Sequence, residues 1–411
     1  MKYIILGTLS LLLCVAFINA QKPAYCQAPQ PIPSFRTDGM TLQMVQVITR
    51  HGDRTPLFNT FNSNMNQWDC SLGTYMYPSQ NTQENALSNV NRLFRKVYMP
   101  NREYLPGNCS VGQLTSLGYS QHIQLGSSLH DLYVQKYELL SPQLDPTELY
   151  FRSTDVPRTL QSAQGNIQGL YPAATNPSGI LNINTMDSYF EDMIPNSKLC
   201  PALVNLNKNA TTTPEYIAWE NQNAALKQQV MQILGLTSFP GYWYNILDFV
   251  YTSQCHDLPI PQGMTQSIID QVYQNAMFEY KYPLTFPIVA RLSSAPFLAE
   301  LVQNIKAFVA GQTNTKYFLF SGHDSSIAPF VNLFGIFNDW PGYASHVEIE
   351  LWADFRNDYY IQFKYNGENY ELEGCDNYMC TIEDFLNLSE SLIVPDYANA
   401  CNNATSLYDF Y

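Results

Sequence analysis

The chain has 411 residues, of which 45% are hydrophobic and 14% charged, a composition typical of a globular protein with a substantial core. Its formal net charge of −14 argues against nucleic-acid binding, which needs a basic footprint, and against attraction to anionic lipid. Acid-rich surfaces lose charge as the pH falls, so the composition suits an acidic compartment.

The first 20 residues predict a secretory signal peptide. Lys2 precedes an apolar run that ends in Asn19-Ala20, a small-residue cleavage pattern before Gln21. An N-terminal membrane anchor is the alternative, but the run is short for a span, and we expect no stable anchor. Eight cysteines follow the signal and are candidates for disulfides, although counting does not fix their pairing: Cys26, Cys70, Cys109, Cys200, Cys255, Cys375, Cys380 and Cys401.

Four N-x-S/T sequons predict glycosylated surface loops, with chance occurrence as the alternative for one or two of them. They begin at Asn108, Asn209, Asn387 and Asn403.

The first half of the chain alternates strand and helix patterns. After an irregular Pro-rich arm at 21–38, a strand is predicted at about 42–48 and a helix at 115–136, with a Thr cap. The segment between them, 57–110, predicts a loop-rich insertion near the cleft. The run ELYFRS predicts a strand, and a capped helix follows it.

The second half changes character. Residues 172–285 predict a helical domain, helix returns near 292–311, and KYFLFSGHDSSIAPFVNLFG predicts strand, turn and helix. Residues 346–371 alternate and break twice, which predicts a hairpin or meander. We therefore expect an α/β domain from 21–171 and 286–411, with a mixed, mainly parallel sheet, helices on both faces and an antiparallel edge.

Three apolar strands end in polar, cap-rich turns: VQVITRHGDRTP, ELYFRSTDVPRT and YFLFSGHDSS. Because ligands bind beyond the carboxyl ends of strands in an open α/β sheet, we expect these turns to converge. They would bring together Arg50, His51, Arg54, Arg158, His323 and Asp324.

This set of side chains suits phosphoryl transfer. Three guanidiniums supply forked donors for a tetrahedral anion. A neutral imidazole can attack phosphorus and form a covalent intermediate, and a carboxylic acid can protonate the leaving alkoxide. A bound phosphate dianion should raise the pKa of that carboxyl and keep it protonated at mildly acidic pH.

Each member of the set has an ordinary alternative role. Arg50 and Arg54 could be surface residues paired with Asp53, His323–Asp324 a helix cap, and Arg158 a helix-face residue. Three such clusters at three strand ends favour a shared site. The run Cys255-His256-Asp257 is better explained by a disulfide cysteine than by a nucleophilic trio, and no spacing resembles a metal site. His122, His130 and His346 are expected to be packing or surface residues.

The run Arg50-His51-Gly52-Asp53-Arg54-Thr55-Pro56 resembles the RHGxRxP signature of histidine acid phosphatases. The likeness continues through GQLTSLGYSQHIQLG, YFRSTDVPRTLQSA, GHD at 322–324, YAS and GC…C, and covers about residues 40–401. The chain is similar to the lysosomal and prostatic branch of these enzymes. The likeness is weakest in residues 57–110 and 200–290.

The resemblance implies a phosphoglycerate mutase-like fold, no metal or other cofactor, and a role for each residue. His51 would be the nucleophile, with Gly52 leaving room for a close approach. Arg50, Arg54, Arg158 and His323 would bind phosphate, and Asp324 would be the proton donor. Asp53 is expected to be structural.

The resemblance also implies the pairs Cys200–Cys401 and Cys375–Cys380. A third family bridge would join Cys255 to a position near His346, where this chain has no cysteine. With Cys70 and Cys109 assigned to the local insertion, Cys26 and Cys255 remain for each other.

The expected activity is a general phosphomonoesterase in the secretory pathway, lysosomal or extracellular. A phytase is the main alternative, but basic residues beyond the arginines are few and dispersed. Trp243 could line the cleft or belong to the core. An inert phosphate-binding protein is a weaker alternative, and a homodimer is left open.

Overall fold

The computed structural model describes residues 22–34, 37–58, 68–71, 75–76, 94–95, 105, 107–172 and 181–409. The predicted signal peptide, residues 1–20, and most of the loop-rich segment 57–110 lie outside these ranges. Within that segment two short strands, β2 (Tyr75–Met76) and β3 (Phe94–Arg95), pair antiparallel.

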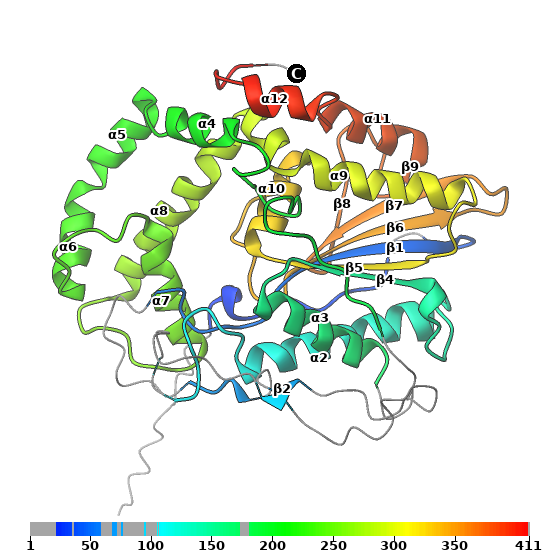
Figure 1. Cartoon of the computed structure of the whole chain (residues 1–411), viewed down its shortest axis with the longest axis horizontal. Helices are drawn as coiled ribbons and strands as arrows, with labels where there is room; N and C mark the ends of the chain where they lie inside the picture. The colour runs from blue at the N-terminus through cyan, green and yellow to red at the C-terminus, as the bar shows by residue number, and fades with distance from the viewer. Residues whose placement is uncertain are drawn as a thin grey trace, which may run out of the picture.

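A mixed sheet forms the centre of the chain (Figure 1). Parallel pairing is confined to three neighbouring strands, whereas the four later strands pair antiparallel to their neighbours. The strand order is β4 (Leu149–Ser153), β5 (Tyr317–Gly322), β1 (Thr41–Arg50), β6 (His346–Ala353), β7 (Tyr359–Tyr365), β8 (Glu368–Tyr370), and β9 (Cys380–Thr381) pairs with β7.

The α/β class and the mixed sheet are confirmed, but the prediction that parallel pairing dominates is wrong. The late hairpin is more than an edge, because β6 pairs directly with β1 and the meander continues outward from it. The predicted segment 346–371 therefore supplies half of the strand order.

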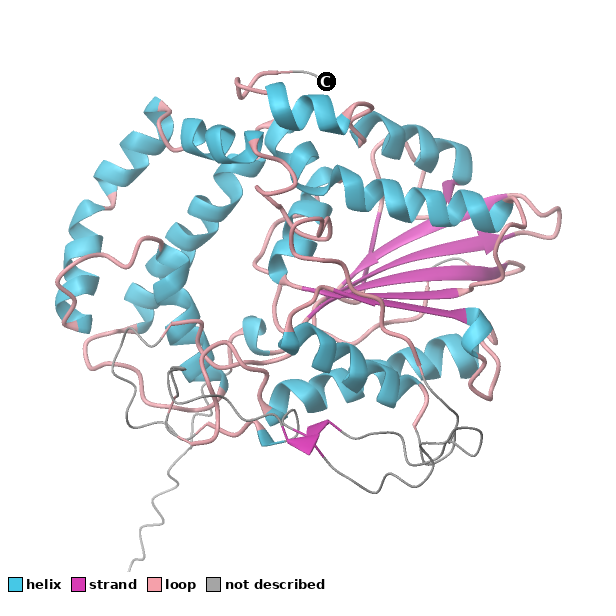
Figure 2. Cartoon of the chain, viewed as in Figure 1, coloured by secondary structure: helices cyan, strands magenta, loops and turns pink. Residues whose placement is uncertain are grey.

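Helices cover both faces of the sheet (Figure 2). On one face lie α2 (Ser116–His130) and α3 (Pro157–Leu170), and on the other α9 (Pro287–Val309), α10 (Asp324–Leu333) and α11 (Ile382–Leu392), followed by α12 (Tyr397–Asn403). Alternate side chains of β1 divide between two cores, as strand geometry requires. Met44 and Ile48 pack in the cluster that includes α9, and Val45 and Val47 pack with α2 and α3.

The two helices on the first face pack closely because glycines remove side chains from their contact. A Cβ added at Gly126 would lie 2.0 Å from the Asn166 carbonyl oxygen, and one at Gly169 would lie 2.1 Å from that of Ile123. The predicted Thr cap is present, since the Thr115 hydroxyl accepts from the Gly118 N–H, and a π-helical stretch (Asp131–Lys136) extends α2.

The described part of the predicted helical region 172–285, residues 181–285, forms five helices that lie to one side of the sheet (Figure 1). They are α4 (Ala202–Ala210), α5 (Pro214–Gln222), α6 (Ala224–Leu234), α7 (Trp243–Cys255) and α8 (Gln266–Leu284). Trp243 is fully buried in the core that α6, α7 and α8 share, which decides between its two predicted roles. Its neighbour Tyr244 lines the cavity described below.

The structure joins the same four cysteine pairs that the sequence predicts, namely Cys26–Cys255, Cys70–Cys109, Cys200–Cys401 and Cys375–Cys380.

Two further findings concern the exposure of the sequons and the length of the helices. All four sequon asparagines are exposed, so glycosylation stays a prediction with accessible acceptors. Within the described ranges no single helix is long and apolar enough to cross a membrane, although α8 and α9, bent by 82°, together meet the length and composition criteria.

Candidate active site

The carboxyl ends of the three parallel strands bring the six predicted residues together. Arg50 ends β1 opposite Gly322 of β5, and Ser153 of β4 lies opposite Ser321 of β5. His51 and Arg54 follow β1, Arg158 lies in the first turn of α3, and His323 and Asp324 lead into α10. All except Arg50 line one cavity of about 300 Å³, and Arg50 reaches it through an ion pair with Asp324.

His51 has the properties of a nitrogen nucleophile. Its side chain is 2% exposed, and its Nδ1 lies 2.8 Å from the Gly52 carbonyl oxygen. That carbonyl can only accept, so Nδ1 carries the proton and Nε2 keeps its lone pair. Burial, followed by the Arg158 and Arg50 cations, lowers the pKa of His51 well below its ordinary value. The imidazole therefore stays neutral in acid, where an ordinary histidine would be protonated.

The three arginines differ in their partners. The Arg54 Nη2 lies 2.7 Å from the Asp248 carboxylate on α7, and the Arg50 Nη2 lies 3.2 Å from that of Asp324. No described carboxylate forms an ion pair with Arg158, whose Nη2 lies 3.3 Å from the His323 Nδ1. Burial, and then the neighbouring Arg54, lower the pKa of Arg158 to about 10.

Each of the three guanidiniums also keeps a buried Nε that no described group satisfies. Buried donors are rarely left without an acceptor, and a cation removed from water normally has an anionic partner. A tetrahedral oxyanion in the cavity would supply both the acceptors and the charge.

Arg158→Met tests this reading of the arginines. Without phosphate, we expect the variant to melt at or slightly above the wild-type temperature, because it removes a half-buried cation that no described carboxylate pairs with. Saturating inorganic phosphate should raise the wild-type Tm by several degrees and the variant's by less than half as much. Thermal unfolding with and without phosphate measures both quantities.

Arg152 provides the contrasting variant. It is buried and pairs with Glu191 at 3.0 Å, Asp192 at 2.5 Å and also Glu300. Arg152→Met leaves these carboxylates without a cation and should destabilise the fold by about 3 kcal/mol. If Arg158→Met destabilised the phosphate-free protein as much, Arg158 would be a structural residue and not an anion receptor.

His323 and Asp324 form the wall opposite His51, and the two imidazole rings lie 5.6 Å apart. The Nε2 of His323 lies 2.9 Å from the Thr154 hydroxyl, and burial, followed by Arg158, lowers its pKa to about 3. Asp324 accepts hydrogen bonds from the Ser325 N–H at 2.8 Å and the Trp340 indole at 3.1 Å.

The charge of Asp324 depends on what occupies the cavity. Burial acts to raise the pKa of this carboxyl, but Arg50 and Arg54, with the Trp340 N–H, outweigh it and lower the pKa. Without an anion the carboxylate is therefore ionised. A phosphate dianion, which competes for the same arginines, would raise the pKa and favour the protonated form.

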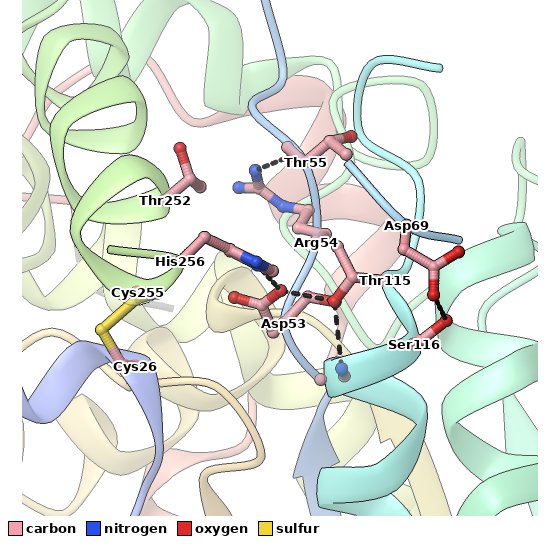
Figure 3. A network of polar contacts seen from close by, with 12 residues as sticks. Cys26, Asp53, Arg54, Thr55, Asp69, Thr115, Ser116, Thr252, Cys255 and His256 are labelled. Atoms are coloured by element: carbon pink, nitrogen blue, oxygen red, sulfur yellow. Dashed lines mark hydrogen bonds and ion pairs between the residues drawn. A yellow bond between two sulfur atoms is a disulfide. The ribbon is translucent and has the colours of Figure 1, made fainter. Parts of the chain in front are cut away.

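Asp53 is buried and does not pair with either arginine, so the alternative of surface ion pairs in this loop is wrong. Its Oδ1 accepts from the Thr115 hydroxyl and from the His256 Nε2, each at 2.5 Å (Figure 3). These contacts connect the loop after β1 to α2 and to the residue that follows α7.

Gly52 has a packing role that the sequence does not predict. A Cβ at this position would lie 2.2 Å from the carbonyl oxygen of Gly118, so its small size allows the loop to cross the first turn of α2.

The other histidines and the cysteine singled out in the sequence make contacts away from the cavity. His122 binds the Arg50 carbonyl oxygen at 3.0 Å, His130 that of Leu170 at 2.7 Å, and His346 that of Pro29 at 2.8 Å. Cys255 is in a disulfide, so Cys255-His256-Asp257 is no nucleophilic trio. The described residues include no group of three or more His, Cys, Asp or Glu arranged to hold a metal ion.

Sequence reasoning missed several side chains that line this cavity, among them Tyr25, Asp248, Tyr280 and Trp340. The first three of these lie in the arm, in α7 and in α8, where no motif marks them. Trp340 precedes β6 in an irregular segment. A signal existed for Tyr25 only, since the predicted Cys26–Cys255 bond fixes its neighbour near α7.

The sequence of this chain is similar to those of known proteins. Residues 41–366, well over half of the chain, match the model of the histidine phosphatase superfamily (branch 2), and the chain belongs to this family. Counting factor 60 from Dictyostelium discoideum is 53% identical over 98% of this chain and 98% of its own length. Lysosomal acid phosphatase from Bos taurus is 27% identical over 90% of this chain and 82% of its own length.

A solved structure agrees with the fold. Hafnia alvei phytase in complex with myo-inositol hexakis sulphate has a TM-score of 0.61 at 14% identity, over 89% of this chain and 99% of that chain. At this identity the likeness shows the fold alone. The match to the family model confirms the resemblance to histidine acid phosphatases at the level of the family.

Proposed function

We propose that this protein is an acid phosphatase that hydrolyses phosphate monoesters through a phosphohistidine at His51. The single observation that carries the proposal is the buried, neutral imidazole of His51 beside Arg158, a half-buried cation that forms no ion pair with a described carboxylate. The named activity of the 27% identical relative supports it, whereas the name of the 53% identical relative specifies no activity.

The reaction has two steps. Nε2 of His51 attacks phosphorus while the bond from phosphorus to the ester oxygen breaks, and Asp324 gives its proton to the departing alkoxide. The Asp324 carboxylate then takes a proton from a water molecule that attacks phosphorus, which breaks the phosphorus–nitrogen bond and releases inorganic phosphate. Arg50, Arg54 and Arg158 hold the phosphoryl oxygens in both steps, with His323 on the opposite side.

An acidic pH optimum is expected from the protonation states that His51 and Asp324 need in the substrate complex. The lowered pKa of His51 keeps the nucleophile unprotonated as the pH falls below about 6. Asp324 must be protonated in the substrate complex, and that form is lost as the pH rises. Activity should therefore be highest in acid and decline toward neutrality.

A small or apolar alcohol group fits the cavity better than a polyanion. Beyond the phosphate arginines, the lining is aromatic, apolar or acidic, with Tyr244, Leu247 and Asp248 on α7. No further lysine or arginine among the described residues lines it. This favours simple monoesters over inositol hexakisphosphate, which needs several cations.

The four disulfides support a location in the secretory pathway, and we propose that this location is lysosomal or extracellular.

A substrate panel across pH 3–8 with excess chelator tests the proposal. We expect p-nitrophenyl phosphate to be hydrolysed best near pH 5, equally with and without EDTA, and kcat/KM for inositol hexakisphosphate to be at least about tenfold lower. A reversed preference would favour a phytase. Phosphate binding without turnover of any ester would favour an inert binding protein, and loss of activity with EDTA would contradict the proposed chemistry.

A further inference from the structure

The N-terminal arm, residues 22–34, lies against the candidate active site although it precedes the family-matched residues 41–366. Tyr25, in the short helix Ala24–Cys26, is 7% exposed and lines the same cavity as His51. The Tyr343 N–H donates to the Tyr25 carbonyl at 2.8 Å, and the Ala28 N–H donates to the Tyr343 carbonyl at 2.8 Å. The arm is therefore fixed along the segment that leads into β6.

Tyr25 makes direct contact with a phosphate-site arginine. The Arg50 guanidinium is fully buried against the rings of Tyr25 and Tyr343, 4.6 and 4.5 Å from their centroids. Its Nη2 donates to the Tyr25 hydroxyl at 2.8 Å, and its Nη1 donates to the Pro341 carbonyl. Both terminal nitrogens are thus held in place, and Nε is the nitrogen left without a described partner.

One disulfide and three hydrogen bonds connect the arm to the loop that carries His51. Cys26 is bonded to Cys255 at the end of α7, and the next residue, His256, contacts Asp53 (Figure 3). The Asp53 N–H donates to the Gln121 side-chain oxygen at 2.8 Å, and the Gln121 amide nitrogen donates to the Cys26 carbonyl at 2.7 Å. Displacing the arm would disturb the loop that carries His51.

Further contacts hold the two ends of the arm. The Lys22 ammonium donates to the Cys255 carbonyl at 2.7 Å and pairs with Asp257 at 2.8 Å. In the middle of the arm the Pro29 carbonyl binds His346, near the position where the family's bridge to Cys255 would end, and at the far end the Ser34 N–H donates to the Tyr137 hydroxyl at 2.6 Å. The resemblance implies a disulfide from Cys255 to a position near His346. In this chain Cys255 is bonded to the arm instead, and His346 contacts the arm through a hydrogen bond.

We propose that Tyr25 is a positioning residue of the phosphate site, which orients the Arg50 guanidinium through its hydroxyl, and that the Cys26–Cys255 bond holds it there. The inference rests on the proposed function, since it concerns the same phosphate site. Because the hydroxyl accepts from Arg50, its own proton is free for another acceptor, and a phosphate oxygen beside Arg50 can take it.

Tyr25→Phe tests the role of the hydroxyl, since it keeps the ring against Arg50 and leaves the disulfide intact. We expect kcat/KM for p-nitrophenyl phosphate to fall about tenfold, and the inhibition constant of inorganic phosphate to rise by a similar factor. A purely structural role would lower Tm without changing phosphate affinity. Tyr251→Phe is the matched control, because its ring lies 5.1 Å from that of Tyr25 and does not line the cavity.

The two proposals fail in different ways. If the wild type hydrolysed no ester, the proposed function would fall, and calorimetric titration with inorganic phosphate would still test Tyr25. About tenfold weaker phosphate binding by Tyr25→Phe, with Tyr251→Phe unchanged, supports the inference. Equal affinities of wild type and Tyr25→Phe, or no phosphate binding by the wild type, overturn it.

The double variant Cys26→Ala/Cys255→Ala tests the anchor separately. It keeps Tyr25 but frees the arm from α7, so phosphate inhibition should weaken in the same direction, together with a lower Tm. An unchanged inhibition constant would overturn the role given to the disulfide.

Discussion

Replacing His51 by alanine should lower kcat for every phosphate monoester by at least about 10⁴-fold, because no other nitrogen among the described lining residues is placed to attack phosphorus. His323, the nearest alternative, has one nitrogen at the Thr154 hydroxyl and the other at Arg158. The three arginines remain in the variant, so inorganic phosphate should still raise its Tm. Steady-state kinetics and thermal unfolding of the same preparation measure both effects.

His130→Gln is the matched control, since this histidine lies at the end of α2 and contacts the Leu170 carbonyl instead of the cavity. It should keep near-wild-type activity. Turnover by His51→Ala within about tenfold of the wild type would rule out His51 as the nucleophile.

Replacing Asp324 by asparagine should have an effect that depends on the leaving group. For an alkyl phosphate, whose alkoxide needs a proton to depart, kcat/KM should fall by about 10²- to 10⁴-fold. For p-nitrophenyl phosphate, whose phenolate leaves readily, the loss should be about tenfold or less. The comparison uses both substrates with one enzyme preparation, so differences in folded fraction cancel.

The substitution should also flatten the decline of alkyl phosphate activity toward neutral pH, because the group whose proton is lost there has been removed. Asp155 is an exposed aspartate between β4 and α3, and Asp155→Asn serves as the control. It should leave kcat/KM for both substrates unchanged. Equal losses on both substrates would show that Asp324 acts through its contact with Arg50 rather than as the acid.

The sequence predicts local features well where one short segment contains the cause. The apolar run of β1 ends at Arg50, the Thr115 cap starts α2, and His323 lies at the start of α10, all close to their predicted positions. The convergence of the three strand ends follows from the rule for parallel strands. The sequence alone therefore identifies the six candidate residues of the site.

Features that depend on pairing between distant segments could not be predicted in this way. Nothing local to β6 shows that it would pair with β1 rather than at an edge. Asp248 becomes an ion-pair partner of Arg54 only because α7 packs beside the catalytic loop. Gly52 faces Gly118, 66 positions away, so its packing role appears only when the loop and α2 are brought together.

Trapping the covalent intermediate is the measurement that tests the central claim most directly. The enzyme is mixed with a labelled monoester at pH 5, quenched within milliseconds in base, digested and mapped by mass spectrometry. We predict phosphate on the peptide that contains His51, stable in base and lost in acid, and none in His51→Ala. Steady turnover with no phosphorylated peptide, or with the phosphate on another residue, would contradict the account.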